Sequence, residues 1–376
     1  MSVAIDLVGT NLGSGTKTYN INFCNELNSI EFSSNIKILI CKSYLNQIDK
    51  NKNKKVEFLI KPDFLSITFF RLLWMYLILP LELKFLNIKK IYSPMNFTSL
   101  FFKFLNIKTV LCLHSNLPWI NYKLMPGNII RNFITKKFME MSIYSCDLLI
   151  VNSNFAKKEI IKALGLYKKN IKVVYLGVNK NFILKNNKKN IIKNFNYNQK
   201  YILSVLSCVK YHNIINLLRG FKLLSNDFNI KLVLVLQVLD KGYFLDIKKF
   251  IRDNFLERKI IILSNLFQNQ LPKLYKNAEV YVFTSYCEVF GLTSLEAMSQ
   301  STPVVISNTS ALPEINKKAA QYFNPDDIKD IKNKLKKVIS DKKLRVKLVN
   351  NGIELLKKYN VSKCVKKTFN IIENLK

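Results

Sequence analysis

Two acidic residues eight positions apart, Glu288 and Glu296, flank the predicted junction of a strand and a helix. The strand covers 280–284, Glu288 lies in the loop that follows, and Gly291 opens a helix that carries Glu296 about one turn in. An ionised carboxylate is a pure hydrogen-bond acceptor, so one of the two would bind paired ribose hydroxyls while the other faces a sugar. The alternative is that Glu288 is a charged loop residue and Glu296 faces solvent.

The start of this helix offers donors to an anion. The N–H groups of Gly291, Leu292 and Thr293 would face the loop, because the first N–H groups of a helix have no acceptor within it. Such a helix start binds phosphate readily. The stretch is therefore typical of a site for a phosphorylated nucleotide.

A histidine, His114, ends the predicted strand 109–113. Ligands of open parallel sheets bind at the carboxyl ends of the strands, so this histidine is a candidate for substrate contact. Asn116 and Trp119 follow in the same loop and are candidates for contacting an acceptor. The alternative is a histidine that only packs or caps.

Glycines follow the first predicted strand, which covers 3–8. Gly13 and Gly15 lie in the turn, and Thr16 comes directly after them. A glycine turn lets the backbone approach a ligand closely, but many turns after a first strand need glycine for their conformation alone.

Short β-rich runs alternate with helical patterns along the chain, which predicts an α/β fold with parallel sheets. Two such sets occur, each expected to form a Rossmann-like, doubly wound domain. Expected are an N-terminal domain at 1–180, a linker rich in Asn and Lys at 181–200, a C-terminal domain at 201–355, and a helix at 356–376 that packs back on the N-terminal domain. Two facing parallel sheets of this kind would form a ligand-binding cleft.

The most apolar segment covers 64–86 and is interrupted by Arg71 and Glu82. Its uncharged stretch, 72–81, is far shorter than the roughly 20 residues needed to span a bilayer. We expect an amphipathic helix whose apolar face packs in the core, with docking on a membrane surface as the alternative. No basic segment precedes the first strand, so no signal peptide is expected.

The seven cysteines are scattered and form no C-x-x-C pair, which favours reduced thiols over a disulfide framework. The cysteines and the two histidines lack the spacing of a zinc site. No D-x-D pair follows a predicted strand. We therefore expect neither a metal nor a cofactor.

The formal net charge is +34, from 59 Lys and Arg against 25 Asp and Glu. So basic a surface attracts polyanions such as nucleic acid, an anionic membrane or phosphorylated substrates. Abundant Lys, Asn and Ile also arise from an AT-rich coding sequence without any ligand. Among the polyanions we favour the membrane and expect no nucleic-acid partner, because no recognised nucleic-acid-binding module is present.

The combination of E-x-F-G-L at 288–292, L-E-A-M at 295–298 and P-V-V at 303–305 resembles the donor-binding signature of retaining GT-B glycosyltransferases of family 4, also called group 1. Other similar stretches follow in the family's order, so the likeness covers nearly the whole chain: 11–19, 71–94, 151–164, 173–178 and 273–279.

The resemblance implies a retaining glycosyltransferase of hexosyltransferase type, with a UDP- or GDP-sugar as co-substrate and a glycan or lipid-linked acceptor. It implies a role in cell-surface polysaccharide synthesis, in the cytoplasm or peripheral on the inner face of the plasma membrane. The residues that it assigns are Glu288 and His114 as catalytic; Glu296, Phe290, Gly291, Leu292, Thr293, His212, Lys210, Gly13 and Gly15 as donor-binding; and Thr16, Asn116 and Trp119 as acceptor-binding.

The sequence departs from the family where an Arg and a Lys usually follow the first strand of the second domain. Aligning 201–221 puts Ser207 at the Arg position and His212 at the Lys position. Fixed cations stabilise a departing diphosphate. Three alternatives follow for this chain: His212 acts as a weaker cation, Lys210 substitutes for the missing Lys, or the donor site is impaired. The usual glycine after the strand 259–263 is also missing, so the nucleobase does not follow from the resemblance.

Three other functions remain open at this point. A non-catalytic binding or partner subunit with the same fold would explain Ser207 and His212. A nucleic-acid-binding protein would explain the charge. An epimerase or a phosphorylase would share the two-domain fold, although the E-x-F-G-L stretch argues against both.

Overall fold

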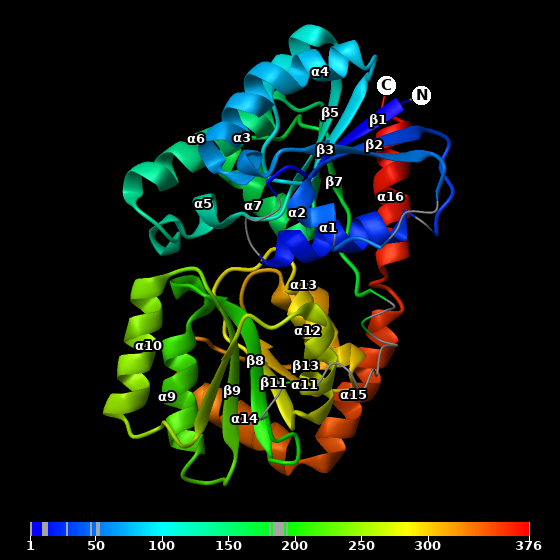
Figure 1. Cartoon of the computed structure of the whole chain (residues 1–376). Helices are drawn as coiled ribbons and strands as arrows, with labels where there is room; N and C mark the ends of the chain where they lie inside the picture. The colour runs from blue at the N-terminus through cyan, green and yellow to red at the C-terminus, as the bar shows by residue number, and fades with distance from the viewer. Residues whose placement is uncertain are drawn as a thin grey trace. The chain divides into compact units, whose positions relative to one another are not determined.

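A computed structural model describes residues 2–9, 14–27, 29–45, 47–49, 53–179, 182, 192 and 195–375. The chain divides into two compact units, each built on one parallel sheet with helices on both of its faces (Figure 1). Unit 1 contains 1–116, 129–176 and 361–376, and unit 2 contains 117–128 and 177–360. The predicted α/β fold with two doubly wound, Rossmann-like halves is confirmed.

Unit 1 has a seven-stranded sheet in the order β3-β2-β1-β4-β5-β6-β7, with every pair parallel. Its strands are β1 (Ser2–Asp6), β2 (Asn35–Cys41), β3 (Val56–Lys61), β4 (Lys90–Ser93), β5 (Lys108–Leu113), β6 (Leu148–Val151) and β7 (Ile171–Val173). Its helices are α1 (Ser14–Glu26), α2 (Lys42–Leu45), η1 (Asp63–Ser66), α3 (Thr68–Leu73), the π turn η2 (Trp74–Ile78), α4 (Leu79–Phe85), η3 (Leu100–Leu105), α6 (Ile129–Ser145), α7 (Asn154–Leu164) and α16 (Val361–Glu373).

Unit 2 has a six-stranded parallel sheet in the order β10-β9-β8-β11-β12-β13. Its strands are β8 (Tyr201–Cys208), β9 (Lys231–Val238), β10 (Ile260–Ser264), β11 (Val280–Phe283), β12 (Val304–Ser307) and β13 (Ala320–Phe323). Its helices are α5 (Leu117–Ile120), η4 (Tyr122–Leu124), η5 (Lys210–His212), α9 (Ile214–Leu224), α10 (Lys241–Asp253), η6 (Gln268–Gln270), α11 (Leu271–Asn277), α12 (Leu292–Ser299), α13 (Leu312–Asn316), η7 (Lys317–Ala319), α14 (Ile328–Ser340) and α15 (Lys342–Leu356).

In each sheet the strand order reverses once, between β1 and β4 in unit 1 and between β8 and β11 in unit 2. Ligands of open α/β sheets bind outside the carboxyl ends of the strands at such a switch point. Strands covered on both faces are almost wholly apolar, and every residue of β8 is buried. The sheets therefore leave polar side chains mainly at their ends, where the site residues lie.

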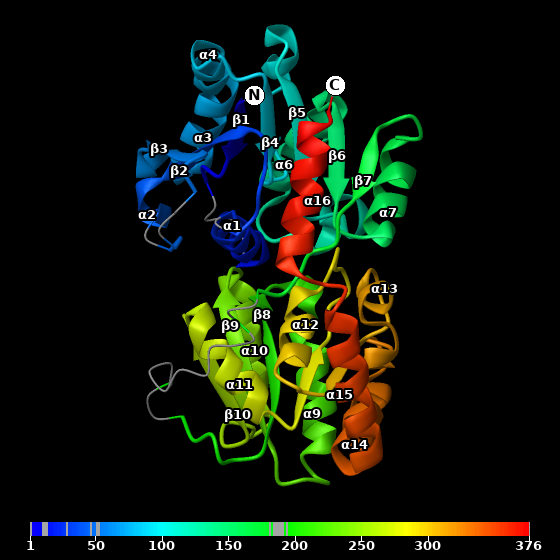
Figure 2. The ribbon, with the colours of Figure 1, turned by 90° about the vertical axis from the view of Figure 1, so that its right-hand side faces the viewer.

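The unit boundaries differ from the predicted domain limits in two places. The loop 117–128 groups with unit 2, although the sequence predicted it within the first domain. The segment that groups with unit 1 at the end of the chain begins at Val361, five residues after the predicted 356. Figure 2 shows α16 lying along the sheet of unit 1. Most of the predicted linker lies outside the described residues.

The segment 64–86 differs from the amphipathic helix that was predicted. It forms most of η1 and then α3, η2 and α4, and the last two bury Trp74, Met75, Leu79 and Leu83 in the core. The opposite face is apolar as well and is exposed, so the segment has no polar face. All seven cysteines are buried and unpaired.

Candidate functional site

Gly291 forms the turn that starts α12 at the carboxyl end of β11. Its φ is +82°, a left-handed conformation that favours glycine, and a Cβ there would come within 2.4 Å of Leu312 Cδ2. The backbone N–H groups of Leu292 and Thr293 begin the helix and have no acceptor within it. This glycine is therefore required both by its conformation and by the close packing of α12 on Leu312.

Glu296 is buried inside unit 2, which is not the solvent-facing position of the alternative interpretation. The Tyr275 hydroxyl donates to Glu296 Oε2 at 3.2 Å. Burial raises the pKa of Glu296 to about 7, against the opposing effect of hydrogen bonds from Tyr275 and Gln268. At neutral pH the carboxyl group is therefore partly protonated. In its protonated form it can donate as well as accept.

Glu288 and His212 form a pair across the switch point of unit 2. His212 follows β8 and Glu288 follows β11, and these two strands are neighbours in the sheet. His212 Nδ1 lies 2.6 Å from the Ser207 carbonyl oxygen, and its Nε2 lies 3.2 Å from Glu288 Oε1. Both ring nitrogens face acceptors, so the contacts are satisfied when each nitrogen carries a proton, or when Glu288 carries one.

The loops around the pair hold it in place through the main chain. The Thr284 hydroxyl donates to the His212 carbonyl at 2.8 Å. The Glu288 N–H donates to Ser310 Oγ at 2.9 Å, and the Glu288 carbonyl accepts from the Ala311 N–H at 3.2 Å. The structure therefore fixes Glu288 and His212 from both sides of the switch point.

The other donor-binding predictions in unit 2 fall into different environments. Lys210 is exposed, next to the pair in sequence. The Phe290 ring is buried and packs edge-on against Tyr359 with centroids 5.6 Å apart, so only its backbone is available to a ligand. Thr293 Oγ1 accepts from the Tyr281 hydroxyl at 2.7 Å. Tyr281 also contacts Tyr275, the partner of Glu296, so the two tyrosines connect Thr293 with Glu296.

In unit 1, His114 lies at the carboxyl end of β5. The Asn152 amide lies 3.0 Å from His114 Nδ1, and the Tyr19 ring packs against the imidazole with centroids 4.7 Å apart. Burial lowers the pKa of His114 to about 4, so the ring is neutral at pH 7. With Asn152 donating to Nδ1, the proton lies on Nε2, which is enclosed and has no hydrogen-bond partner among the described residues.

Asn116 resembles His114 in having one unsatisfied polar atom. Its Nδ2 donates to the Ala156 carbonyl at 2.9 Å, while its buried Oδ1 has no partner in the described part of the chain. Unpaired buried polar atoms are rare and call for an explanation such as a missing ligand or water. Together, His114 Nε2 and Asn116 Oδ1 provide one donor and one acceptor that no described residue satisfies.

The remaining predicted residues of this group are less well defined. Gly15 and Thr16 lie in the first turn of α1, and Gly15 is exposed with open space around it. Trp119 is half-buried in α5, which groups with unit 2. Gly13 lies outside the described residues.

Several residues of these networks were missed by the sequence analysis. Asn96 and Asn152 follow β4 and β6, so the strand-end argument used for His114 would have found both. Asn96 Oδ1 accepts from the His114 N–H at 2.6 Å. Tyr275 lies in the stretch 273–279, but nothing in its spacing points to Glu296.

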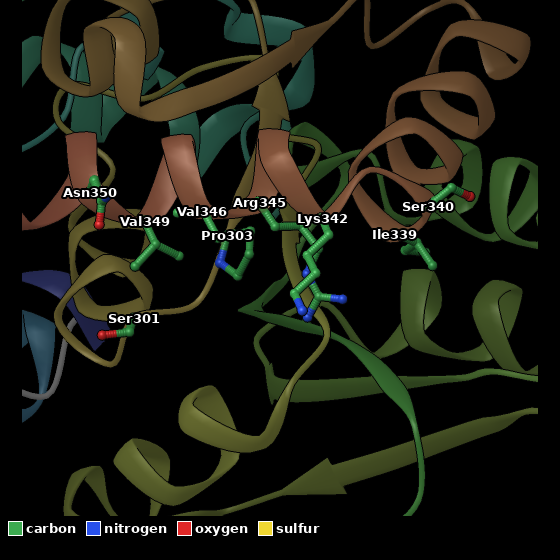
Figure 3. A pocket seen from close by; sticks show the side chains of 9 residues that line it. All are labelled: Ser301, Pro303, Ile339, Ser340, Lys342, Arg345, Val346, Val349 and Asn350. Carbon is green, nitrogen blue, oxygen red and sulfur yellow. The ribbon is translucent and has the colours of Figure 1, made fainter.

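A cavity of about 530 Å³ lies elsewhere in unit 2, lined by α14, α15 and the residues before β12 (Figure 3). Pro303, Lys342 and Arg345 contribute to its wall, and Arg345 is paired with Glu279 at 2.8 Å. It lies at the amino end of β12, away from the carboxyl ends where the predicted residues gather. Within the described ranges, no group of His, Cys, Asp and Glu is arranged to hold a metal ion.

Two family descriptions match the sequence in succession. Residues 39–182 match Glycosyltransferase Family 4, and residues 185–355 match Glycosyl transferases group 1. Together they cover most of the chain and both units.

Curated relatives share moderate sequence identity with the chain. The O-antigen chain mannosyltransferase RfbU of Salmonella typhimurium is 29% identical over 247 residues, which are 63% of this chain and 66% of that protein. The O-antigen chain mannosyltransferase B of Escherichia coli is 27% identical over 242 residues, 62% of this chain and 63% of that protein. The chain thus spans slightly less than two thirds of the length of these relatives.

Solved structures share the fold. Anabaena HepE in complex with UDP-glucose superposes with a TM-score of 0.76 at 15% identity, covering 100% of each chain. Sucrose-phosphate synthase from Thermosynechococcus elongatus superposes with a TM-score of 0.75 at 15% identity, covering 99% of this chain and 98% of that one.

Proposed function

The chain belongs to the GT-B glycosyltransferases of family 4, the glycosyl transferases group 1, and from this premise we propose the reaction that it catalyses. It transfers a sugar from a nucleotide-sugar to a glycan or lipid-linked acceptor, in cell-surface polysaccharide synthesis and with retention of anomeric configuration. The observation that carries the proposal is the arrangement at the switch point of unit 2. There, Glu288 and Glu296 flank a helix start whose first N–H groups are free of intrahelical acceptors.

The donor would bind unit 2. The carboxyl group of Glu296 would hold the ribose, and the start of α12 together with His212 would hold the diphosphate. Glu288 and the backbone at Phe290 and Gly291 would position the sugar. Departure of the diphosphate builds negative charge, which fixed donors and a protonated His212 would stabilise.

In unit 1, His114 and Asn116 are the candidates for contact with a sugar. The free Nε2–H of His114 would donate to a sugar oxygen, and Asn116 Oδ1 would accept from a hydroxyl. Because His114 is neutral at pH 7, it would act as a hydrogen-bond donor and not as a cation. Lys210, Gly15, Thr16 and Trp119 remain further candidates for contact.

The relatives and structural neighbours suggest which donors to test first. RfbU and the Escherichia coli relative are mannosyltransferases by name, and HepE binds UDP-glucose. We therefore propose a UDP- or GDP-sugar as the co-substrate and mannose as the first sugar to test. We further propose that the enzyme works in the cytoplasm, peripherally on the inner face of the plasma membrane.

Thermal unfolding with added nucleotides tests the donor site. Wild type and Glu296→Ala would be heated with uridine, guanosine and adenosine diphosphates and with their sugar conjugates. A ligand at about 100 times its Kd stabilises by about 2.7 kcal/mol, a shift of roughly 2–4 °C for a domain of this size. We expect one base class to shift the wild type and not the variant. No shift with any nucleotide would contradict the proposal.

A second candidate function is a non-catalytic binding or partner subunit. Two observations favour it. His212 Nε2, which would face a diphosphate, already contacts Glu288. Ser207, at a position where the family has a cation, offers its carbonyl oxygen to His212 Nδ1. Turnover of the donor that stabilises the protein discriminates between the two. Stabilisation without turnover, in the wild type and in His212→Lys alike, would favour the non-catalytic subunit.

A further inference from the structure

The segment formed by α3, η2 and α4 in unit 1 is apolar on the face that it turns to solvent. Five large apolar side chains on this face are between 42% and 91% exposed. They form what we call the apolar stripe: Phe69, Leu73, Leu77, Leu81 and Phe85. A surface helix of a globular protein normally places polar residues there, so the stripe needs a partner that covers it.

The four-residue spacing keeps the stripe on one side. Four residues advance an α-helix slightly more than one turn, and they advance the wider π turn η2 slightly less. The opposite side is firmly anchored in unit 1. Arg71 Nε donates to the Val8 carbonyl at 2.8 Å, and the guanidinium forms a buried ion pair with Asp6. Because these contacts fix the opposite side of the segment to unit 1, the stripe faces solvent.

Neighbouring elements extend the stripe into a wider surface. The Tyr76 ring in η2 contacts Phe101 of η3 and Phe138 of α6, with centroids 6.1 and 5.7 Å apart. Figure 1 shows α3, α4 and α6 on one flank of unit 1. Exposed apolar residues continue on these elements: Phe104 on η3, and Ile129, Ile130 and Phe133 on α6.

Lysine side chains adjoin the most exposed apolar residues in the sequence. Lys84 precedes Phe85, and Lys103 precedes Phe104, and all four side chains are exposed. The acidic residues of α4 and α6 are already paired, Glu82 with Lys61 and Glu140 with Lys137. Apolar side chains alternating with Lys are typical of surfaces that lie in the interface of an anionic bilayer.

We propose that the apolar stripe and its neighbours on η3 and α6 dock unit 1 on an anionic lipid membrane, with the apolar side chains inserted among the lipids and the lysines at the headgroups. The inference rests on the proposed function, which places the enzyme at a membrane and gives it a lipid-linked acceptor, and it adds the surface that makes the contact. A second copy of the chain fits less well, because Lys is depleted from protein–protein interfaces. In the described part of the chain no helix is long and apolar enough to cross a bilayer.

Vesicle co-sedimentation tests this surface. The stripe variant is Leu73→Ser, Leu77→Ser and Leu81→Ser, and the matched control is Leu223→Ser, Leu245→Ser and Ile353→Ser, all exposed in unit 2. The vesicles are phosphatidylcholine with or without phosphatidylglycerol. We expect wild type and control to bind the anionic vesicles equally. We expect the stripe variant to bind them at least about tenfold more weakly. An unchanged thermal midpoint would establish that the variants fold.

Three results would overturn the inference. The first is equal binding of the stripe variant and the control. The second is equal binding of wild type to vesicles with and without phosphatidylglycerol. The third is that sedimentation velocity without lipid finds a wild-type dimer which the stripe variant converts to a monomer. The nucleotide-induced thermal shift, measured on the same proteins, distinguishes failure of the docking surface from failure of the proposed function, because the donor residues lie outside the apolar stripe.

Discussion

Burial of Glu296 makes the stability of unit 2 depend on pH near neutrality. Its pKa rises from 4.5 to about 7, which corresponds to about 3 kcal/mol at most. The folded state binds the proton more tightly than the unfolded chain. The stabilisation is therefore complete below about pH 4.5 and is lost as the pH rises through about 7.

Glu296→Gln removes this titration and keeps a neutral group of the same shape. We expect the variant to be more stable than wild type at about pH 8, by roughly 2–3 kcal/mol, and close to wild type at about pH 5. Urea unfolding at the two pH values measures the difference. A difference that stays the same at both would show that Glu296 does not titrate between them.

The residues of the site were predictable one at a time, but their pairing was not. Glu288, Glu296 and His114 lie at strand ends or helix starts, which local patterns indicate. The contact of His212 with Glu288 spans 76 positions and depends on β8 and β11 being neighbours, which is a property of the strand order. The partly protonated state of Glu296 depends on the packing around it, and no pattern in its own helix signals that.

At the scale of elements, α16 returns to unit 1 from the far end of the sequence. The Phe369 ring stacks on Phe23 and Phe32, with centroids 5.6 and 5.3 Å apart. Glu373 accepts from the Ser33 N–H at 3.0 Å, and Lys90 Nζ donates to the Glu373 carbonyl at 2.7 Å. The C-terminal helix is therefore part of the core of unit 1.

Phe369→Ala tests this role, because the ring is buried between two aromatic neighbours. We expect a loss of about 3–5 kcal/mol in the stability of unit 1, from lost burial and the cavity left behind. Denaturant unfolding is followed by the emission of Trp74, in a Trp119→Phe background, so that only unit 1 is observed. Lys366→Ala, exposed on the same helix, is the control and should leave the midpoint unchanged; a similar loss there would contradict the interpretation.

The elements that the sequence analysis missed are those with weak or ambiguous patterns. β3 and β13 are edge strands, and β3 carries Glu57 and Lys61 within a half-exposed run, so neither has the apolar continuity of a central strand. The segment 64–86 was identified as helical, but its outward face was misjudged. Apolar residues on every side of a helix do not reveal which side the core takes.

At the scale of the whole molecule, the net charge of +34 acts over a longer range than any contact. Each Lys or Arg near an anionic bilayer contributes about 1 kcal/mol, and salt screens this attraction beyond about 8–10 Å. Charge alone does not distinguish lipid from nucleic acid, since both present phosphates. The apolar stripe does, because only a bilayer offers apolar chains to cover it.

The basic charge and the apolar stripe predict different responses to salt and to the kind of polyanion. We expect binding to anionic vesicles and to duplex DNA to weaken together as salt is raised, because both depend on the same lysines. At equal phosphate concentration and low salt, binding to vesicles should exceed binding to DNA, and the Ser substitutions at Leu73, Leu77 and Leu81 should bring the two close together. Parallel vesicle co-sedimentation and DNA mobility-shift titrations measure this. A DNA affinity far above the vesicle affinity would mean that the basic surface serves nucleic acid, and that the stripe contributes nothing to the choice of partner.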